Sequence, residues 1–375
     1  MNKKLALLLY RYFPFGGLQK DFMGIAGELL SRGHQIKVYT RSWEGEIPDS
    51  LEVIQLGEKG ISNYSKNRIF IKKAFKSLAD FNPDIVFGFN KMPGLDLYFA
   101  ADTCFAAQAQ NKNYLQKYTR RFRQSINFEE EVFSRYASTK TLLLNDNQQN
   151  EFARFYKTPL DRMTIVPPGI DADWSSYRPI NIREKLGIPP EDKILLFVGS
   201  DFSRKGLDRA IFALSYLQKQ KKTATLVVIG DDLQTPYSKI INQESLSNKV
   251  HFIGPSQDVA SFMKSSDLLV HPAREEAAGN IIIEAIVSGL PSLVTEAVGF
   301  SSEVLKHESG AVLTGDFKQE NFNLLLSDIL EEEKLSSIKE SICHLSDCDY
   351  FFSRFKYIAD SVSYTHLTLP TILLV

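Results

Sequence analysis

SDLLVHPAREEAAGNIIIEAIVSGLP, residues 266–291, is the stretch of the chain that decides the fold. Its first seven residues are mostly apolar and predict a buried strand. Small residues follow, and then an apolar run at helical spacing that Gly289 and Pro291 terminate. Two carboxylates, Glu276 and Glu284, stand eight positions apart on either side of the helix start. This order of strand, turn and helix indicates one step of an α/β fold with a parallel sheet.

The turn between the two glutamates has the properties of an anion site. Its residues let backbone N–H groups at the positive end of a helix approach a ligand closely. They are Ala277, Ala278, Gly279 and Asn280. Glu284 lies about 7 Å further along the axis, at ~1.5 Å per residue, where it suits two adjacent sugar hydroxyls. Glu276 would face what lies beyond the phosphates. The alternative is an amphipathic helix with two solvated glutamates, but the preceding strand and the Gly-Pro stop favour a nucleotide-sugar site.

The E-x7-E spacing after a strand resembles the signature of retaining glycosyltransferases of family 4. These enzymes have the GT-B fold, in which two Rossmann-like domains face a central cleft. Most members read E-G-F-G here, whereas this chain reads E-A-A-G, like the glucosyltransferases of the lipopolysaccharide core. The resemblance covers about residues 5–360. It implies UDP-glucose as donor, an inner-core heptose of nascent lipopolysaccharide as acceptor, no cofactor or metal, and a peripheral position on the cytoplasmic face of the inner membrane.

Length and composition predict a two-domain cytosolic protein. At 375 residues the chain is too long for one ordinary core, and a net charge of −1 gives no global field for nucleic-acid binding. The three cysteines are sparse and lack C-x2-C spacing, which is typical of a reduced protein. The apolar run near the N-terminus spans only residues 5–9, so it predicts a first strand rather than a signal peptide. No stretch approaches the ~20 apolar residues of a membrane span.

Domain boundaries follow from the position of Val-Pro-Pro-Gly-Ile-Asp, residues 166–171, where GT-B chains cross between domains. We expect an N-terminal acceptor domain (1–165), a C-terminal nucleotide-sugar domain (166–348) and a last helix (349–362) that packs back on the first domain. Residues 363–375 resemble translated cloning sequence and are set aside. The D-x-D motif of Asp171 and Asp173 lies beside the segment that connects the two domains. It is interpreted as part of this linker and not as a metal-binding motif. Trp174 stands where relatives have a basic side chain, which puts one diphosphate contact in doubt.

The N-terminal domain opens with a βαβ pattern that lacks G-x-G-x-x-G, so a dinucleotide fingerprint is not supported. Gly16 and Gly17 allow close backbone approach, and the resemblance places such a loop against the donor's phosphates and sugar. It also points Asp21 into the cleft from the first helical turn. A plain turn and a dipole-stabilising acid are the alternatives. Asp102 follows a strand at the sheet edge where ligands bind, so we predict contact with sugar or acceptor, or else a helix cap.

Residues 112–133 interleave basic and aromatic side chains, with Tyr114, Leu115, Tyr118, Phe122 and Ile126 on roughly one helical stripe. A basic amphipathic helix indicates either contact with a membrane surface or packing on its own domain with a solvated face. Charge alone favours packing, and the resemblance favours an anionic membrane. Nucleic acid is a weaker third interpretation, because acidic residues 129–131 follow at once. The predicted membrane contacts are Lys112, Lys117, Arg120, Arg121 and Arg123.

Arg204 and Lys205 stand just before a predicted helix that begins at Gly206. Two cations beside a helix start form a diphosphate clamp, and the alternative is a solvated basic turn. The resemblance implies that Arg204 and Lys205 bind the diphosphate of the donor. It also implies that Glu284 contacts the ribose and Glu276 the transferred sugar. The predicted catalytic residues are therefore Asp21, Asp102, Lys205 and Glu276.

Two other function classes remain open from the residues. One is a GT-B transferase that uses another nucleotide sugar, or another lipid-linked or soluble glycan acceptor. The other is a sugar-nucleotide-binding protein without turnover, against which the retained Arg204, Lys205, Glu276 and Glu284 argue.

Overall fold

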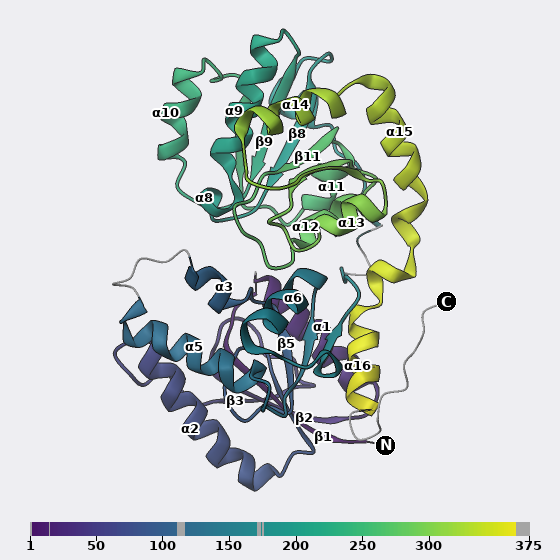
Figure 1. Ribbon diagram of the computed structural model, residues 1–375. Coiled ribbons are helices and arrows are strands. Elements are labelled where there is room, and N and C mark those ends of the chain that lie inside the picture. The colour runs from purple at the N-terminus through teal and green to yellow at the C-terminus, as the bar shows by residue number, and fades with distance from the viewer. Residues whose placement is uncertain (1, 15, 111–116, 171–173, 175, 365–375) are drawn as a thin grey trace. The chain divides into compact units, whose positions relative to one another are not determined.

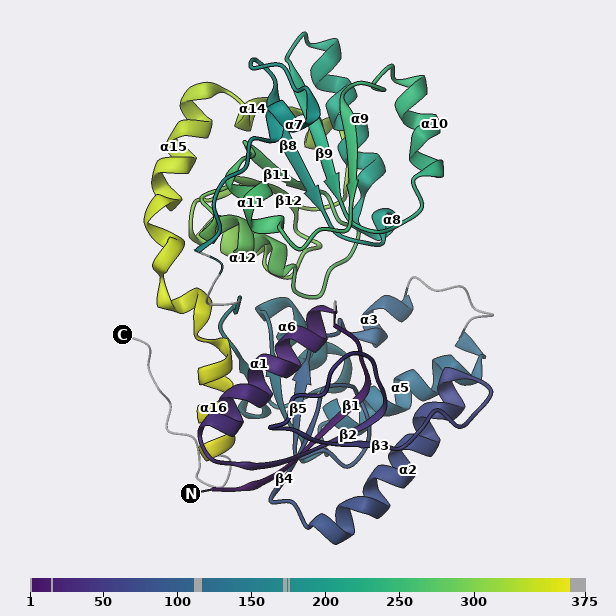
Figure 2. The ribbon, with the colours of Figure 1, turned by 180° about the vertical axis from the view of Figure 1, so that it is seen from behind.

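The computed structural model of the chain describes residues 2–14, 16–110, 117–170, 174 and 176–364. The chain divides into two compact units (Figures 1 and 2). Unit 1 comprises Met1–Pro167 and Ser353–Val375, and unit 2 comprises Pro168–Phe352. The first crossing falls two residues beyond the expected boundary. The chain returns to unit 1 at Ser353, four residues after the expected start of the last helix.

Unit 1 contains a seven-stranded parallel sheet, in the order β3-β2-β1-β4-β5-β6-β7, among the residues described. Alternate residues of β1 pack against each face, and Leu5, Leu7 and Leu9 are buried as fully as their neighbours. Burial on both faces is the property of a parallel sheet covered by helices. The strands are β1 (Lys4–Tyr12), β2 (Gln35–Trp43), β3 (Glu52–Gln55), β4 (Ile85–Gly88), β5 (Leu97–Ala100), β6 (Lys140–Leu143) and β7 (Met163–Ile165).

The helices of unit 1 cover this sheet, and one core cluster joins β1 and β2 to the helices that follow β3, β5 and β6. At its centre the rings of Phe133 and Phe152 stack with centroids 3.5 Å apart. The helices are α1 (Gly17–Ser31), α2 (Asn63–Phe81), α3 (Phe105–Gln110), α5 (Arg120–Phe133), α6 (Asp146–Tyr156), the 3₁₀ turn η1 (Leu160–Arg162) and α16 (Arg354–Tyr364). Helix α16 packs on α1, where a Cβ at Gly24 would lie 2.3 Å from the Phe355 ring.

Unit 2 contains a six-stranded parallel sheet in the order β10-β9-β8-β11-β12-β13, again among the residues described. Its central strands β8, β9 and β11 consist almost wholly of buried apolar residues. The strands are β8 (Lys193–Val198), β9 (Ala224–Ile229), β10 (Val250–Gly254), β11 (Leu268–His271), β12 (Ser292–Thr295) and β13 (Gly310–Leu313).

Two helices of unit 2, α14 and α15, follow one another directly in the chain. Between them Glu331 adopts φ −61° and ψ 133°, which is not helical and separates the two. The helices are α7 (Ile182–Leu186), α8 (Phe202–Lys205), α9 (Leu207–Lys219), α10 (Thr235–Gln243), α11 (Val259–Lys264), α12 (Asn280–Val287), α13 (Ser301–Lys306), α14 (Gln319–Ile329), α15 (Glu332–Ile342), and the 3₁₀ turns η3 (Cys343–Asp347) and η4 (Asp349–Phe352).

In each sheet, successive strands are added first on one side of the first strand and then on its other side. In unit 1 this change of side lies between β1 and β4, and in unit 2 between β8 and β11. In open parallel sheets, ligands bind outside the carboxyl ends of the strands at such a switch point. The carboxyl ends of β8 and β11 lead directly to the segments that hold Arg204, Lys205 and Glu276.

Candidate functional site

Arg204 and Lys205 lie in the last turn of the short helix α8, which follows β8. They directly precede the predicted helix, α9, whose N-cap is Gly206. The short helix α8 itself was not expected: Asp201 adopts a left-handed conformation (φ 60°) and caps α8 by accepting from the Arg204 N–H at 3.3 Å. Gly206 then ends α8 and begins α9 with φ +79°. A Cβ there would lie 2.2 Å from the Pro272 carbonyl oxygen, so only glycine fits.

The Glu276 carboxylate meets both cations, although it lies more than 70 residues away in the sequence. It contacts the Lys205 ammonium directly, and the Arg204 guanidinium lies 3.2 Å from the same oxygen. The segment that carries Glu276 is held by its backbone: the Glu276 N–H donates to Ala297, and its carbonyl accepts from Gly299, both at 3.0 Å. The structure thus brings three predicted site residues together, with the cations paired to Glu276.

Burial dominates the electrostatics of this cluster. Removal from water, reinforced by the positive charge of Arg204, lowers the pKa of Lys205 to about 7, and the negative charges of Asp201 and Glu284 oppose this shift. Glu284 therefore acts on Lys205 electrostatically, as expected for a carboxylate at the same site. Lys205 is the group whose charge changes near neutral pH, which makes it a candidate functional residue.

His271, the last residue of β11, belongs to the same cluster and is not predicted from the sequence. Its Nε2 lies 3.9 Å from the Glu276 carboxylate, and the ring is fully buried. Burial, together with Lys205 and Arg204, lowers the pKa of His271 well below its ordinary value, so the ring is neutral. Neither ring nitrogen has a hydrogen-bond partner among the residues described. A titratable residue at the carboxyl end of an otherwise apolar strand was the signal that could have identified it.

The small-residue turn forms the start of α12 as predicted. Gly279 caps the helix with φ +81°, and a Cβ there would lie 2.4 Å from the Val298 side chain, so both the backbone conformation and the lack of space require glycine. The Phe300 N–H donates to the Ala278 carbonyl at 2.8 Å and fixes the turn. Ala277 and Asn280 flank it and are half-buried, and Glu284 is the fifth residue of α12 and half-buried. The predicted donor-binding residues of this turn thus form one continuous helix start beside Glu276.

Two arginines that the sequence did not single out hold the loop after β11. Arg274 forms a bidentate ion pair with Asp208, at 2.8 and 2.6 Å, and its N–H donates to the Arg204 carbonyl at 2.8 Å. Arg209 donates to the Pro272 carbonyl at 3.1 Å. These contacts fasten the Glu276 segment to α8 and α9, which fixes the spacing between the carboxylate and the cations.

In unit 1 the glycine loop lies at the start of α1. Gly16 is the N-cap and Gly17 the first helical residue. A Cβ at Gly16 would collide with Gln19, whereas one at Gly17 would meet nothing within 4 Å. Gly17 thus has open space beside it, which is compatible with the predicted close approach to a ligand.

Asp21 is not directed at a ligand as expected. It lies in the second turn of α1, is 5% exposed, and accepts from the Arg354 guanidinium at 2.8 Å. Arg354 is fully buried and also donates to the Pro167 carbonyl at 3.1 Å. The reason is the packing of α16, which brings a buried cation onto α1. The structure therefore gives Asp21 a structural ion pair.

Asp102 follows β5 at the carboxyl edge of the sheet and is exposed. Its backbone carbonyl accepts from the Gln148 side-chain amide at 3.0 Å, and its carboxylate has no ion-pair or hydrogen-bond partner within the described chain. The position matches the prediction of a carboxylate that a ligand can reach.

In the described part of the basic segment, Lys117 is helical and residues 118–119 interrupt the helix. Lys112, Tyr114 and Leu115 lie outside the described residues. Helix α5 begins only at Arg120, because the Thr119 hydroxyl caps it by accepting from the Phe122 N–H at 3.2 Å. The exposed cations of this segment make no ion pair with any described residue. They are Arg120, Arg121 and Arg123, with Lys117 half-buried.

The apolar side chains of α5 face inward in part. Phe122 packs its ring 5.3 Å from that of Phe105, whereas Tyr118 is 54% exposed. The segment is thus packed on its own domain and also presents a basic surface, so the two main interpretations are compatible.

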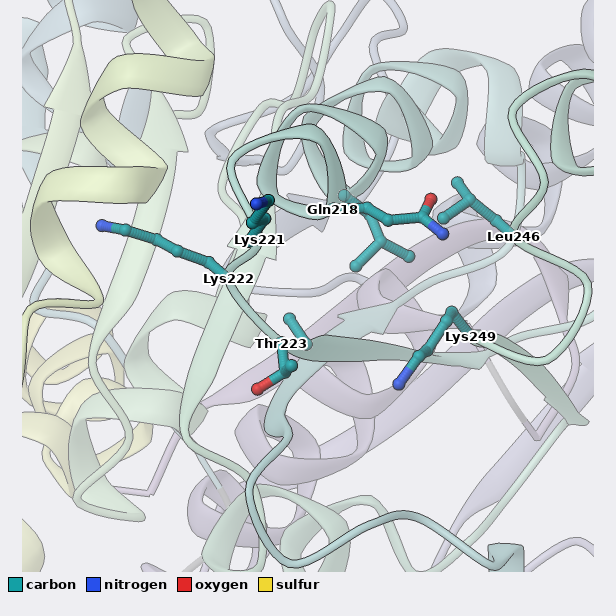
Figure 3. A pocket seen from close by; sticks show the side chains of 8 residues that line it. Gln218, Lys221, Lys222, Thr223, Leu246 and Lys249 are labelled. Atoms are coloured by element: carbon teal, nitrogen blue, oxygen red, sulfur yellow. The ribbon is translucent and has the colours of Figure 1, made fainter.

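A hollow of about 260 Å³ lies at the opposite edge of the unit 2 sheet, near the start of β9. Its three lysines point in different directions (Figure 3), and two of them are paired, Lys222 with Glu331 and Lys249 with the buried Asp192. This hollow is therefore not a convergent anion site, and the donor-site candidates lie at the carboxyl edge of the sheet instead.

Within the part of the chain that the structure describes, no three histidine, cysteine or acidic side chains are grouped so that they could hold a metal ion, and no helix has the length and apolar character of a membrane span. Asp171 and Asp173 lie outside the described residues. Trp174 is 7% exposed and donates to the Ser288 hydroxyl at 2.9 Å, so this residue packs against the end of α12.

Comparison with known proteins identifies the same two halves. Residues 15–174 match glycosyltransferase family 4, and residues 180–340 match the glycosyl transferases group 1. The lipopolysaccharide glucosyltransferase WaaG of Escherichia coli is 40% identical over 367 residues, which cover 96% of this chain and 98% of that one. A crystal structure of WaaG has a TM-score of 0.87 at 39% identity and covers 96% of this chain and 99% of that one.

More distant structures share the fold alone. Sucrose-phosphate synthase from Thermosynechococcus elongatus has a TM-score of 0.77 at 16% identity and covers 97% and 98% of the two chains. HepE of Anabaena, in complex with UDP and glucose, has a TM-score of 0.71 at 18% identity and covers 98% and 100%. Two Rossmann-like parallel sheets, the family matches and the extended identity to WaaG lead to one conclusion: the chain is a GT-B glycosyltransferase and belongs to family 4, with the lipopolysaccharide glucosyltransferase among its relatives.

Proposed function

We propose that this enzyme transfers glucose from UDP-glucose to an inner-core heptose of nascent lipopolysaccharide, with retention at the anomeric carbon and without a metal ion. The single observation that carries the proposal is the convergence of Arg204, Lys205 and Glu276 beside the start of α12, at the switch point of unit 2. The name of the 40% identical relative supports lipopolysaccharide as the acceptor class. The HepE complex with UDP-glucose supports a UDP-sugar in this fold.

In this proposal Arg204, Lys205 and the start of α12 hold the diphosphate, Glu284 accepts the ribose hydroxyls, and Glu276 contacts the transferred sugar. Because Glu276 contacts Lys205 directly, a diphosphate must compete with this carboxylate for the ammonium. The carboxylate is then released toward the sugar. The exchange would couple donor binding to the placement of Glu276.

The chemical step needs no strong base on the protein. The bond from the anomeric carbon to the β-phosphate oxygen breaks, and the acceptor oxygen forms the new bond on the same face. The acceptor's proton passes to the departing phosphate. Arg204 and Lys205 stabilise the charge that grows on this phosphate, which is the largest usual contribution to such catalysis.

Unit 1 would supply the acceptor side. We assign Asp102 to the sugar or acceptor, since its carboxylate is exposed at the carboxyl edge of the sheet, and Gly16 and Gly17 to close approach of the donor. Asp21 we assign to the ion pair with Arg354 rather than to the reaction. The basic surface of α5 would hold the enzyme on the cytoplasmic face of the inner membrane.

The test is transfer of labelled glucose from UDP-glucose onto heptose-terminated core lipid, with other nucleotide sugars and a heptose-free core lipid as controls. We expect glucose to be transferred in the α-configuration only when both UDP-glucose and the heptose are present. Transfer from a different nucleotide sugar, or onto a different glycan at a higher rate, would replace this function by the broader GT-B alternative.

The lowered pKa of Lys205 predicts a specific pH dependence. The free enzyme loses the ammonium as pH rises through about 7, so kcat/KM for the donor should fall there, since this parameter reports the free enzyme. The bound diphosphate favours the charged form, so kcat should hold to higher pH. Lys205→Arg keeps its charge at all these pH values and should abolish the fall. A wild-type kcat/KM that stays flat between pH 6 and 9 would contradict the prediction.

Activity should persist after chelation with EDTA. The expectation rests on the resemblance and on the interpretation of Asp171 and Asp173 as linker. Transfer would be measured in EDTA and again after addition of Mg²⁺ or Mn²⁺, with an Asp171→Asn, Asp173→Asn variant alongside. Activity that EDTA abolishes and the metal restores, and that the double variant lacks, would show that the aspartates grip a metal.

Replacing Lys117, Arg120, Arg121 and Arg123 together by glutamine should release the enzyme from phosphatidylglycerol vesicles at physiological ionic strength. Each cation near an anionic surface contributes about 1 kcal/mol, screened by salt. Transfer to a detergent-dispersed acceptor should change much less, since the donor residues lie in unit 2.

A matched control removes four positive charges from exposed lysines of unit 2 and should leave vesicle binding intact. These are Lys219, Lys221, Lys239 and Lys334. Equal release by both sets would show that net charge, not the α5 surface, decides binding. Wild-type protein that ignores anionic vesicles would refute the membrane assignment altogether.

A further inference from the structure

A buried carboxylate stands at the centre of unit 1, outside every group assigned above. Glu129 of α5 has no exposed surface, and its two oxygens accept five donors. Two are the backbone N–H groups of Phe105 and Ala106, each at 2.9 Å, and a third is the Lys91 ammonium. The Tyr156 hydroxyl at 2.9 Å and the Cys104 thiol at 3.6 Å complete the set.

These donors come from three separate parts of the fold. Phe105 and Ala106 open α3, Lys91 follows β4, and Tyr156 ends α6. Helices α3, α5 and α6 contact one another in pairs (Figure 1). A single buried charge that satisfies so many donors is costly to remove, because each would lose its partner in a low-dielectric interior. Glu129 therefore fixes how these elements meet.

The segment that Glu129 holds is the one that carries Asp102. The Lys91 ammonium, paired to Glu129, also donates to the Thr103 carbonyl at 2.8 Å. Gln148 holds the other side by donating to the carbonyls of Ala100 and Asp102, at 2.9 and 3.0 Å. The backbone on both sides of Asp102 is thus clamped while its carboxylate stays exposed. A group held in this way is pre-positioned for a ligand.

Two of the donors, the Cys104 thiol and the Tyr156 hydroxyl, have raised pKa values. Burial, and secondarily the charge of Glu129, raises the pKa of Cys104 to about 12, and the same causes raise the pKa of Tyr156 well above its ordinary range. Both side chains therefore remain hydrogen-bond donors to the carboxylate at physiological pH. The buried thiol serves this cluster and is not a reactive cysteine.

We propose that Glu129 is a positioning residue for glycosyl transfer, which acts through residues 101–106 by presenting the Asp102 carboxylate to the sugar or acceptor. The inference rests on the proposed function, since it assumes that Asp102 meets a substrate. It also links α5, which bears the exposed arginines, to the segment that would contact the acceptor. Displacement of α5 would thus be transmitted to Asp102 through one side chain.

The experiment is a double-mutant cycle between Glu129→Gln and Asp102→Asn in the full-length enzyme. Glu129→Gln should lower kcat/KM for the acceptor by on the order of 10- to 100-fold, the scale for a misplaced functional group, and leave UDP-glucose hydrolysis nearly unchanged. In the Asp102→Asn background the same substitution should add less than about twofold, because the group it positions is gone. Glu130→Gln, an exposed neighbour on α5, is the matched control and should behave as wild type.

Equal fold losses from Glu129→Gln in both backgrounds would overturn the proposal, since a merely structural role is independent of Asp102. If Glu129→Gln fails to fold, Tyr156→Phe, which removes a single donor to Glu129, takes its place in the double-mutant cycle with Asp102→Asn. A smaller loss in the Asp102→Asn background would again support the proposal, and equal losses in both backgrounds would overturn it. Hydrogen exchange gives a readout without activity: the amides of Phe105 and Ala106 should exchange faster in Glu129→Gln and Tyr156→Phe, and unchanged protection would also overturn it. Absence of transfer by the wild type would instead count against the proposed function.

Discussion

Replacing Lys205 by alanine is expected to lower the transfer rate by roughly 30- to 1,000-fold while the protein stays folded. The scale is that of one preorganised electrostatic group, about 2–4 kcal/mol of transition-state stabilisation. Lys205 is mostly buried beside Arg204, and its ammonium contacts Glu276 directly. In the donor complex that ammonium would face the diphosphate as its charge grows. The loss should therefore appear in kcat and in kcat/KM alike.

Folding should be little affected, because Glu276 keeps its contact with Arg204 at 3.2 Å after the substitution. Lys239→Ala, on the exposed face of α10 in the same unit, is the matched control and should leave both rate and stability unchanged. The measurement is initial-rate transfer alongside urea unfolding. A folded Lys205→Ala enzyme with unchanged transfer would end the assignment of this residue to the diphosphate.

Replacing Arg354 by methionine is expected to destabilise unit 1 by about 3–5 kcal/mol. Breaking a buried ion pair leaves an uncompensated charge in the interior, which costs far more than the pair itself contributes. Arg354 has no exposed surface and Asp21 almost none, with 2.8 Å between their polar atoms. The Arg354→Met, Asp21→Asn double variant should recover much of the loss, because neither charge is then left unpaired.

The two tryptophans allow the units to be followed separately. Trp43 lies in unit 1 and Trp174 in unit 2, so urea unfolding in a Trp174→Phe background reports unit 1 alone. Glu52→Gln breaks a surface pair with Lys37 in the same unit and should cost only about 0–1 kcal/mol. An Arg354→Met cost as small as this control, or no recovery in the double variant, would show that the ion pair does not hold α16 on α1.

The fold class and much of the candidate donor site could be predicted from local sequence. Apolar runs bounded by turns predict strands that are buried on both faces, and the strands expected near residues 5–9 and 266–272 are present as β1 and β11. The start of α12 was also predictable, because glycine readily adopts the positive φ with which Gly279 caps the helix. Hydrophobic periodicity and turn chemistry act over a few residues, so they are visible in the sequence.

Two helix ends of unit 2 depend on single residues that no local pattern predicts. Asp201, in the left-handed region, starts the short helix α8 ahead of the predicted helix α9, and Glu331 separates α14 from α15. A non-glycine residue with positive φ is uncommon, and nothing in its neighbours announces it. Helix boundaries of this kind depend on which side chain finds a backbone partner, so they are the least predictable feature of a helix.

By itself, the sequence determined that the chain is an α/β protein with two sheets, and which residues of unit 2 have the chemistry to hold a nucleotide sugar. Only the tertiary structure decided which charges meet. Strand order places β8 beside β11 and so brings Lys205 to Glu276 across 71 residues, and the packing of α16 brings Arg354 to Asp21 across 333. The same packing turned Asp21, a predicted catalytic carboxylate, into part of a buried ion pair. Burial and pairing depend on contacts between segments remote in the chain, and no local pattern encodes those contacts.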